Sequence, residues 1–299
     1  MDHHAELSEF LRSRRARLTP REAGVPTDGG PRRVPGLRRE ELARLAGVST
    51  DYYTRLEQGR HLNCSDAVLD AVARALRLSD TERMYLFELA RPKPRTRRRP
   101  VVRPQRVRPG LHRMLETLDG NAPAFILGRQ LDVLAANRLA RALITDFDAL
   151  PQRQRNMARH MFLDESAREL YVDWETCAAE TVGALRLLAA RHPDDPRLTD
   201  LVGELSIKSP EFRTWWADHN VRERTHGTKR YHHPVVGDLT VAYETITFPG
   251  DADQTMCVYT VEPGSSSETA LRLLANWTAG SEPQAAPSTA SATQGEPSR

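Results

Sequence analysis

Apolar residues recur at the three-to-four-residue spacing of amphipathic helices through residues 6–90. In RREELARLAG, Leu42 and Leu45 lie on one such stripe, and Gly47 follows as a helix-ending residue. Ser65 stands where an N-cap is expected before DAVLDAVARAL, and SDTE has the form of a capping box before the last apolar run. The pattern predicts five short helices.

Residues 111–277 mix short alternating segments with longer helical ones. The stretch PAFILGRQLDVLAANRLARAL predicts a strand, a turn at Gly128, a second strand and a helix capped by Asn137. LTVAYETITF and TMCVYTVEP alternate as antiparallel strands do, and SSSE caps a closing helix. This arrangement predicts an α+β fold. Between these parts, helices are predicted at about 151–162, 165–191, 196–206 and 209–219.

The chain therefore divides into an all-α domain at 7–90 and an α+β domain at 111–277. Between them, residues 91–110 are rich in proline and arginine, which predicts an extended basic linker. Residues 278–299 have the small, polar composition of a disordered tail. Because the linker composition does not suit a rigid lever, the two domains are expected to communicate through changed pairing of the α+β domains.

Charge is divided unevenly along the chain. Residues 1–110 hold 24 Lys and Arg against 14 Asp and Glu, whereas the remainder holds 19 against 26, within an overall charge of +3. A basic first part beside an acidic second part predicts that only the first part meets a polyanion.

Composition also excludes several classes of protein. No apolar run approaches the roughly 18 residues of a membrane span, and the first residues lack the apolar centre of a signal peptide, so a cytoplasmic protein that does not contact membranes is expected. Cys64, Cys177 and Cys257 are far apart and have no paired spacing, which argues against a zinc site or a disulfide framework. No phosphate loop, nucleophile elbow or zinc-protease motif is present, so an enzyme and a cofactor are not expected.

The stretch GVSTDYYTRLEQG has the pattern of a tight helix-turn-helix. Ser49 is positioned to cap the second helix, and Tyr53 and Leu56 share its inner side. The opposite side is predicted to be exposed and suited to a major groove, and it carries Asp51, Thr54, Arg55 and Gln58.

Two motifs make this pattern more specific. RREELARLAGVSTDYYTRLEQGR resembles the lambda-repressor-type helix-turn-helix of XRE-family regulators, and together with HHPVVGDLTVAYE it resembles the MmyB-like branch of that family. The resemblance covers about 7–277 and implies a sequence-specific transcriptional regulator that binds double-stranded DNA, expected here as a homodimer. It implies base-facing roles at Thr50, Asp51 and Arg55 and DNA-backbone contacts at Arg39, Ser49 and Arg60, and helical periodicity adds Thr54 to the same exposed face.

The chemistry of this face agrees with that role. Arg55 can donate two hydrogen bonds to guanine, and Asp51, one helical turn earlier, can hold the guanidinium or accept from cytosine. The alternative is an ordinary solvated helix with an ion pair. Arg32, Arg33 and Arg38, in a longer loop before the motif, would reach phosphates or simply keep the loop soluble.

The resemblance also implies that the second domain has a PAS-like sensor fold that binds a small apolar or fatty-acid-like ligand. Its aromatic residues would line a pocket or, alternatively, fill an ordinary core, and a partner-binding adaptor is the rival function. The candidate ligand residues are Trp174, Trp215, Trp216 and Tyr243, with His219 and Arg222 as partners for a ligand carboxylate. His232 and His233 are adjacent and have no completing ligand at standard spacing, so a turn is preferred to a metal site.

Overall fold

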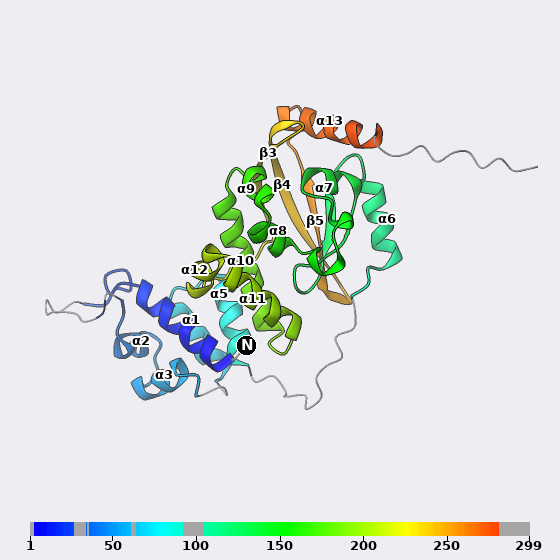
Figure 1. Cartoon of the computed structure of the whole chain (residues 1–299). Coiled ribbons are helices and arrows are strands. Elements are labelled where there is room, and N and C mark those ends of the chain that lie inside the picture. Colours follow the sequence, from blue (N-terminus) through cyan, green and yellow to red (C-terminus); the bar gives the residue numbers. More distant parts are fainter. Residues whose placement is uncertain (1–2, 27–33, 35, 61–63, 92–104, 281–299) are drawn as a thin grey trace, which may run out of the picture.

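The computed structural model describes residues 3–26, 34, 36–60, 64–91 and 105–280. Two bodies are visible, a small helical one from the first part of the chain and a larger one built around a sheet (Figure 1). We call the first body, formed by the described residues up to 91, the reader. We call the second body, formed by residues 105–280, the effector. Most of the predicted tail and most of the predicted linker lie outside the described residues. Residues 278–280, predicted as the start of the tail, instead continue the last helix.

The described part of the reader contains the five predicted helices. They are α1 (His3–Arg17), α2 (Arg39–Leu45), α3 (Thr50–Glu57), α4 (Asp66–Ala75) and α5 (Asp80–Ala90). Three serines start helices as the sequence predicts: Ser49 accepts from the Tyr52 N–H, Ser65 from the Val68 N–H, and Ser79 from the Glu82 N–H in a capping box.

The reader core is built from the inner faces of these helices. Its buried members include Phe10, Leu42, Tyr53, Leu56 and Tyr85. The prediction that Leu45 packs in the core beside Leu42 is wrong, because the Leu45 side chain is 41% exposed. Leu45 ends α2 directly before the turn, where the chain leaves the core.

The effector is organised around a five-stranded antiparallel sheet of described residues with the order β2-β1-β5-β4-β3. The central strand β5 joins the amino-terminal hairpin to the carboxy-terminal one. The α+β prediction is therefore confirmed. The strands are β1 (Ala124–Leu127), β2 (Val133–Ala136), β3 (His226–His233), β4 (Gly237–Phe248) and β5 (Asp251–Thr260).

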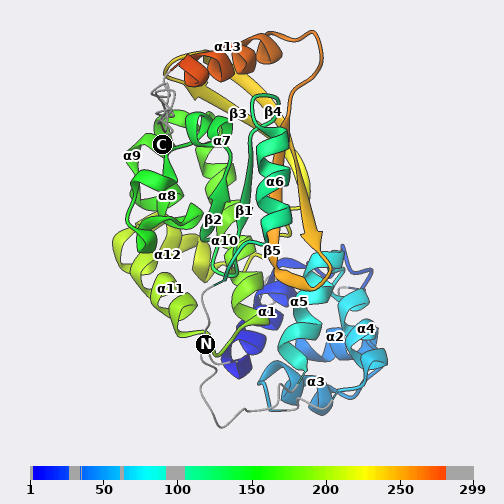
Figure 2. The same ribbon diagram turned by 90° about the vertical axis from the view of Figure 1, so that its right-hand side faces the viewer.

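Helices cover the two faces of the sheet unequally (Figure 2). Alternation along β1 sends Phe125 into the main core and Ile126 into a smaller core on the opposite face, which α6 (Pro109–Leu118) covers. The main core is formed by the sheet with all the other effector helices. These are α7 (Arg138–Leu143), α8 (Met157–Leu163), α9 (Glu165–Leu170), α10 (Trp174–Arg191), α11 (Pro196–Lys208), α12 (Pro210–Ala217) and α13 (Ser266–Gly280), with 3-10 turns at Phe147–Ala149 and Gln152–Gln154.

Four elements differ from the sequence prediction. The predicted helix 151–162 is a 3-10 turn at Gln152–Gln154 followed by α8, which Asn156 caps and which begins at Met157. The predicted helix 165–191 is broken between α9 and α10, because the Val172 N–H donates to the Arg230 carbonyl at 3.0 Å and ties the break to β3. Helix α6 starts at Pro109, inside the predicted linker, where proline is tolerated at the first helical turn. Strand β3 was not predicted, because its sequence HGTKRYHH is too polar to show a hydrophobic alternation, and the turn predicted at His232 and His233 is the end of this strand.

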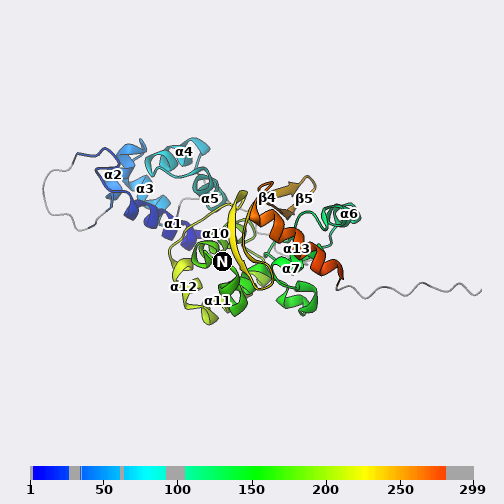
Figure 3. The ribbon, with the colours of Figure 1, turned by 90° about the horizontal axis from the view of Figure 1, so that it is seen from above.

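The reader and the effector pack directly against each other, with α1 and α5 beside α10 (Figures 1 and 3). Leu187 and Ala190 of α10 belong to the same buried cluster as the reader helices. This contact departs from the expectation of loosely tethered domains. The amino-acid composition of the linker predicts the conformation of the linker itself. It does not predict whether the two domains that the linker joins contact each other.

Candidate DNA-binding surface and ligand-binding domain

Helices α2 and α3 form a compact helix-turn-helix. Gly47, between them, has a φ of +67°, a conformation that residues with a side chain adopt only at a cost. The Ser49 Oγ then accepts a hydrogen bond from the backbone N–H of Tyr52, at an N–O distance of 3.1 Å, and so caps the start of α3. On the inner side, Tyr53 and Leu56 are fully buried, which fixes the outer side of α3 toward solvent.

The outer side of α3 presents the polar residues that the sequence predicted. Thr50, Asp51 and Arg55 are exposed, and Thr54 is half-buried. A carboxylate oxygen of Asp51 lies 2.8 Å from a guanidinium nitrogen of Arg55, and the two side chains are 76% and 53% exposed. The pair orients the guanidinium while leaving its remaining donors available to a partner in solution.

Arg39 has a partner that sequence reasoning missed. Its Nε donates to Glu57 Oε1 at 2.8 Å, and Arg15 Nε donates to Glu57 Oε2 at 2.7 Å. Burial raises the pKa of Glu57, but the hydrogen bonds and positive charge of Arg15 outweigh it and keep the pKa below its usual range. Glu57 thus links α1, α2 and α3, while the Arg39 side chain stays 46% exposed at the front of α2.

The remaining predicted DNA contacts lie around α3. Ser49 and Arg60 are exposed at its two ends. Between α3 and Arg60, Gly59 packs so closely on α1 that a β-carbon there would lie 2.6 Å from the His4 carbonyl oxygen. Arg38 is exposed before α2, whereas Arg32 and Arg33 lie outside the described residues. The surface as a whole is a convex helix with basic groups at its edges, suited to a groove bordered by phosphates.

The predicted ligand residues of the effector fall into three separate places. Trp174 and Trp215 form the first with Phe162, at ring-centroid distances of 5.8 to 6.2 Å from one another. Trp174 is buried and donates its indole N–H to the Met161 carbonyl at 3.0 Å. This group fills the space between α8, α10 and α12.

Trp216 and His219 lie in the second place, the contact with the reader. The Arg186 guanidinium lies 4.2 Å from the centre of the Trp216 ring and also donates to the Trp216 carbonyl. His219 Nδ1 is 3.1 Å from Glu6 Oε1 and 3.1 Å from an Arg186 nitrogen. These side chains are therefore engaged in joining the two domains.

Arg222 is next to this contact and is 63% exposed, with Nη1 3.0 Å from Glu180 Oε1. The segment carrying it lies so close to α10 that a β-carbon at Gly183 would approach the Arg222 backbone nitrogen to 2.8 Å. A polar hollow of about 500 Å³ opens here between α5 and α10.

Tyr243 marks the third place, in the main core beneath the sheet. It is buried, and the Lys229 ammonium lies 5.2 Å from the centre of its ring. Lys229 is 2% exposed and donates to the Tyr259 hydroxyl at 3.1 Å. Alternation along β3 turns positions 229, 231 and 233 inward, so this lysine was detectable only once β3 was known to be a strand.

The histidines are used in hydrogen bonds. His233 Nε2 lies 2.9 Å from the Ala142 carbonyl oxygen, and its other nitrogen accepts from the Val235 N–H at 3.2 Å, so it supports the turn into β4. His232 faces the other side of β3 and lies beside Asp238 at 2.5 Å. Within the described ranges, no three His, Cys, Asp or Glu residues gather as metal ligands would.

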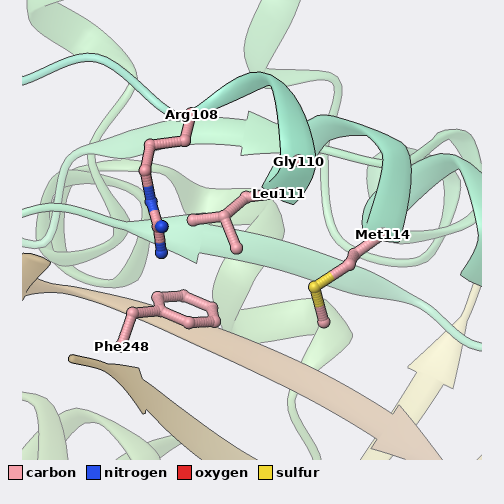
Figure 4. A pocket seen from close by; sticks show the side chains of 5 residues that line it. All are labelled: Arg108, Gly110, Leu111, Met114 and Phe248. Atoms are coloured by element: carbon pink, nitrogen blue, oxygen red, sulfur yellow. The ribbon is translucent and has the colours of Figure 1, made fainter. Parts of the chain in front are cut away.

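A shallow apolar hollow of about 520 Å³ lies on the opposite face of the sheet, between α6 and the end of β4. Figure 4 shows Leu111 and Met114 of α6 facing Phe248 across it, with Arg108 at its edge. Arg108 is already paired with Asp251 at 2.6 Å.

Two family models match the chain in the order of its two bodies. The first describes a helix-turn-helix domain and matches residues 6–86. The second describes the MmyB-like transcription regulator ligand binding domain and matches residues 107–274. No curated protein matches the chain. None of the described helices is both long enough and apolar enough to cross a bilayer.

Proposed function

The chain belongs to the MmyB-like transcription regulators, and we propose that α3 reads a specific operator while the effector binds an apolar, fatty-acid-like molecule that changes operator affinity. Its matched domains are those of a transcriptional regulator with a DNA-binding part and a ligand-binding part, and they indicate a regulator rather than an enzyme.

The DNA-reading half of the proposal is supported by the chemistry of α3. Arg55 can place two donors on guanine O6 and N7, while Thr50 and Asp51 face the same side. Arg39, Ser49 and Arg60 border this side, where they would contact phosphates and hold the helix in register.

The observation that carries the coupling is the placement of helix α10. One side of the helix, from Cys177 to Ala189, lies in the main effector core, and near its carboxy-terminal end Leu187 and Ala190 lie in the reader core. One rigid helix is thereby shared by both bodies. A ligand that displaces α10 in the effector would move or release the reader.

Such coupling has a thermodynamic requirement. The ligand alters DNA binding only if its own affinity differs between the free and DNA-bound states. Typical coupling is about 1–3 kcal/mol, or roughly 5–150-fold in operator affinity. The direct reader–effector contact gives the ligand a physical route to that difference, in addition to changed pairing of two copies of the chain.

We further propose that two copies bind each operator. A single helix of this length contacts few base pairs, and readers of this kind commonly occupy two half-sites about one helical turn apart. The protein would act on DNA in the cytoplasm.

The experiment has two stages. Selection from random double-stranded DNA defines the operator, and mass spectrometry of purified protein then identifies any bound small molecule. Operator affinity is next measured while a panel of fatty acids is titrated. Enrichment of no sequence would overturn the DNA-reading proposal. A selected operator whose affinity no fatty acid changes would overturn the sensing proposal, and a stoichiometric second protein in that sample would indicate an adaptor instead.

A further inference from the structure

We propose that Lys229 and Arg224 form the seat for an anionic group on the effector's ligand, a carboxylate that carries an apolar chain. The proposal rests on the ligand-sensing function proposed above. It goes beyond that function by assigning the place and the charge of the ligand's polar end.

Lys229 is a buried cation that no described carboxylate contacts directly. Its ammonium lies 5.6, 5.2 and 5.5 Å from the ring centres of Tyr171, Tyr243 and Tyr259. Its one hydrogen bond among described residues goes to the Tyr259 hydroxyl, and it forms no ion pair with a described carboxylate. Lysine side chains are rarely buried unless they are paired.

Arg224 adds a second positive charge to the same place. It is half-buried just before β3, and its Nη1 lies 3.4 Å from the hydroxyl of Thr181 on α10. It too forms no ion pair with a described carboxylate. The nearby carboxylate of Glu180 is held by Arg222 at 3.0 Å.

Two neighbouring cations that no anion contacts directly are unfavourable inside a protein. Burial, followed by the positive charge of Arg224, lowers the pKa of Lys229 to about 7. The faces of the tyrosine rings offset part of this cost, as in other cation–π contacts. A bound carboxylate would interact with both cations and favour the charged form of Lys229.

The surroundings also select the kind of anion. Cys177, Tyr243 and Cys257 lie near the cations and belong to the main core, so the rest of the ligand must be apolar. The hydroxyls of Tyr171 and Tyr231 are buried and have no hydrogen-bond partner of ordinary length among the described residues. They interact only weakly with each other, so either could donate to an oxygen acceptor instead.

The other cations considered from the sequence are less suited to this task. His219 is held by Glu6 and Arg186 at the domain contact, and Arg222 is exposed and paired with Glu180. Arg224 instead contacts Thr181, and Lys229 lies near Cys177, so the two cations face the same stretch of α10. That stretch directly precedes the part of α10 that packs on the reader, so filling the seat would act on the shared helix.

The test compares two probes that differ only in their polar end. Delipidated full-length protein is titrated with tetradecanoate and with tetradecan-1-ol at concentrations where both remain monomeric in solution. Since hydrogen bonds to a charged group are stronger than those to a neutral one, we expect the acid to bind at least about tenfold more tightly than the alcohol.

Variants locate the seat. Lys229→Met should abolish the preference for the acid over the alcohol, and Arg224→Gln should reduce it. Arg230→Met is the matched control, because Arg230 is the next residue on β3 but is exposed on the other face and pairs with Asp173. This control should keep the full preference.

Each result supports or contradicts the proposed anionic seat. Equal binding of acid and alcohol by the wild-type protein would overturn the anionic seat but leave ligand sensing standing. Binding of neither probe would overturn both the seat and a fatty-acid-like ligand. If Lys229→Met still prefers the acid over the alcohol, the anionic group binds elsewhere. If Lys229→Met does not fold, the wild-type comparison and Arg224→Gln test the proposal instead.

Discussion

Glu6 of α1 and Arg186 of α10 form a buried ion pair, although they are separated by 180 positions in the chain. Arg186 is fully buried, and Glu6 also accepts a hydrogen bond from the Tyr85 hydroxyl at 2.6 Å. The pair lies where the reader and the effector meet. It makes the relative position of the two domains depend on charged groups that must remain matched.

The first prediction concerns the stability of this contact. Arg186→Met should lower the free energy of unfolding by about 3–5 kcal/mol, because Glu6 is left buried without its cation. The control Arg222→Gln removes an exposed partner nearby and should cost less than about 1 kcal/mol. Chemical denaturation measures both variants, and equal effects would show that the buried pair does not hold the domains.

The second prediction concerns pH. Burial raises the pKa of Glu6, but the His219 hydrogen bond and the Arg186 charge outweigh it and lower the pKa from 4.5 to about 2. The folded pKa is below the unfolded one, so the stabilisation is complete above about pH 4.5 and is lost as pH falls toward 2.

Glu6→Gln provides the comparison for that pH effect. The wild-type protein should exceed this variant in unfolding free energy at neutral pH, and the difference should shrink between pH 4.5 and 2. A difference that stays constant across this range would mean that Glu6 does not titrate as part of the contact.

The third prediction concerns base reading by Arg55. Arg55→Ala should weaken binding to the selected operator by about 1–3 kcal/mol and relax the preference at one base pair. Arg83→Ala, on α5 away from α3 and paired with Asp70, is the control that should change neither. Repeating the DNA selection with Arg55→Ala checks this, and an unaltered motif would exclude Arg55 from base reading.

The fourth prediction separates Arg39 from Arg55. Arg39→Ala should weaken all DNA sequences alike and reduce the slope of log affinity against log salt by about one. Glu57 keeps its hydrogen bond to Arg15, so the reader should remain folded, as a thermal melt would show. A loss confined to one base pair would instead make Arg39 a base-reading residue.

The fifth prediction concerns copy number. The selected operator should contain two half-sites with centres about 34–36 Å apart, or a multiple of that spacing. Sedimentation of the protein–DNA complex should give two chains per operator. A single half-site bound by one chain would contradict the proposed homodimer.

Much of the reader could be predicted from the sequence because its signals are local. Ser49, Ser65 and Ser79 cap helices through hydrogen bonds to residues three positions later, and Gly47 ends α2 by its own backbone preference. The exposed face of α3 follows from helical periodicity in the same way. The helix-turn-helix could therefore be predicted from the single short stretch GVSTDYYTRLEQG.

The shared-helix contact and the Lys229 cluster were decided by tertiary structure. Arg186 and Glu6 are distant in sequence, and each alone is an ordinary charged residue on a predicted helix. Lys229 was missed because β3 shows little apolar alternation and is held as a strand mainly by its pairing with β4. Local periodicity thus determined most of the elements and the exposed face of α3 that we propose for DNA contact, whereas long-range pairing alone decided which charges became buried together.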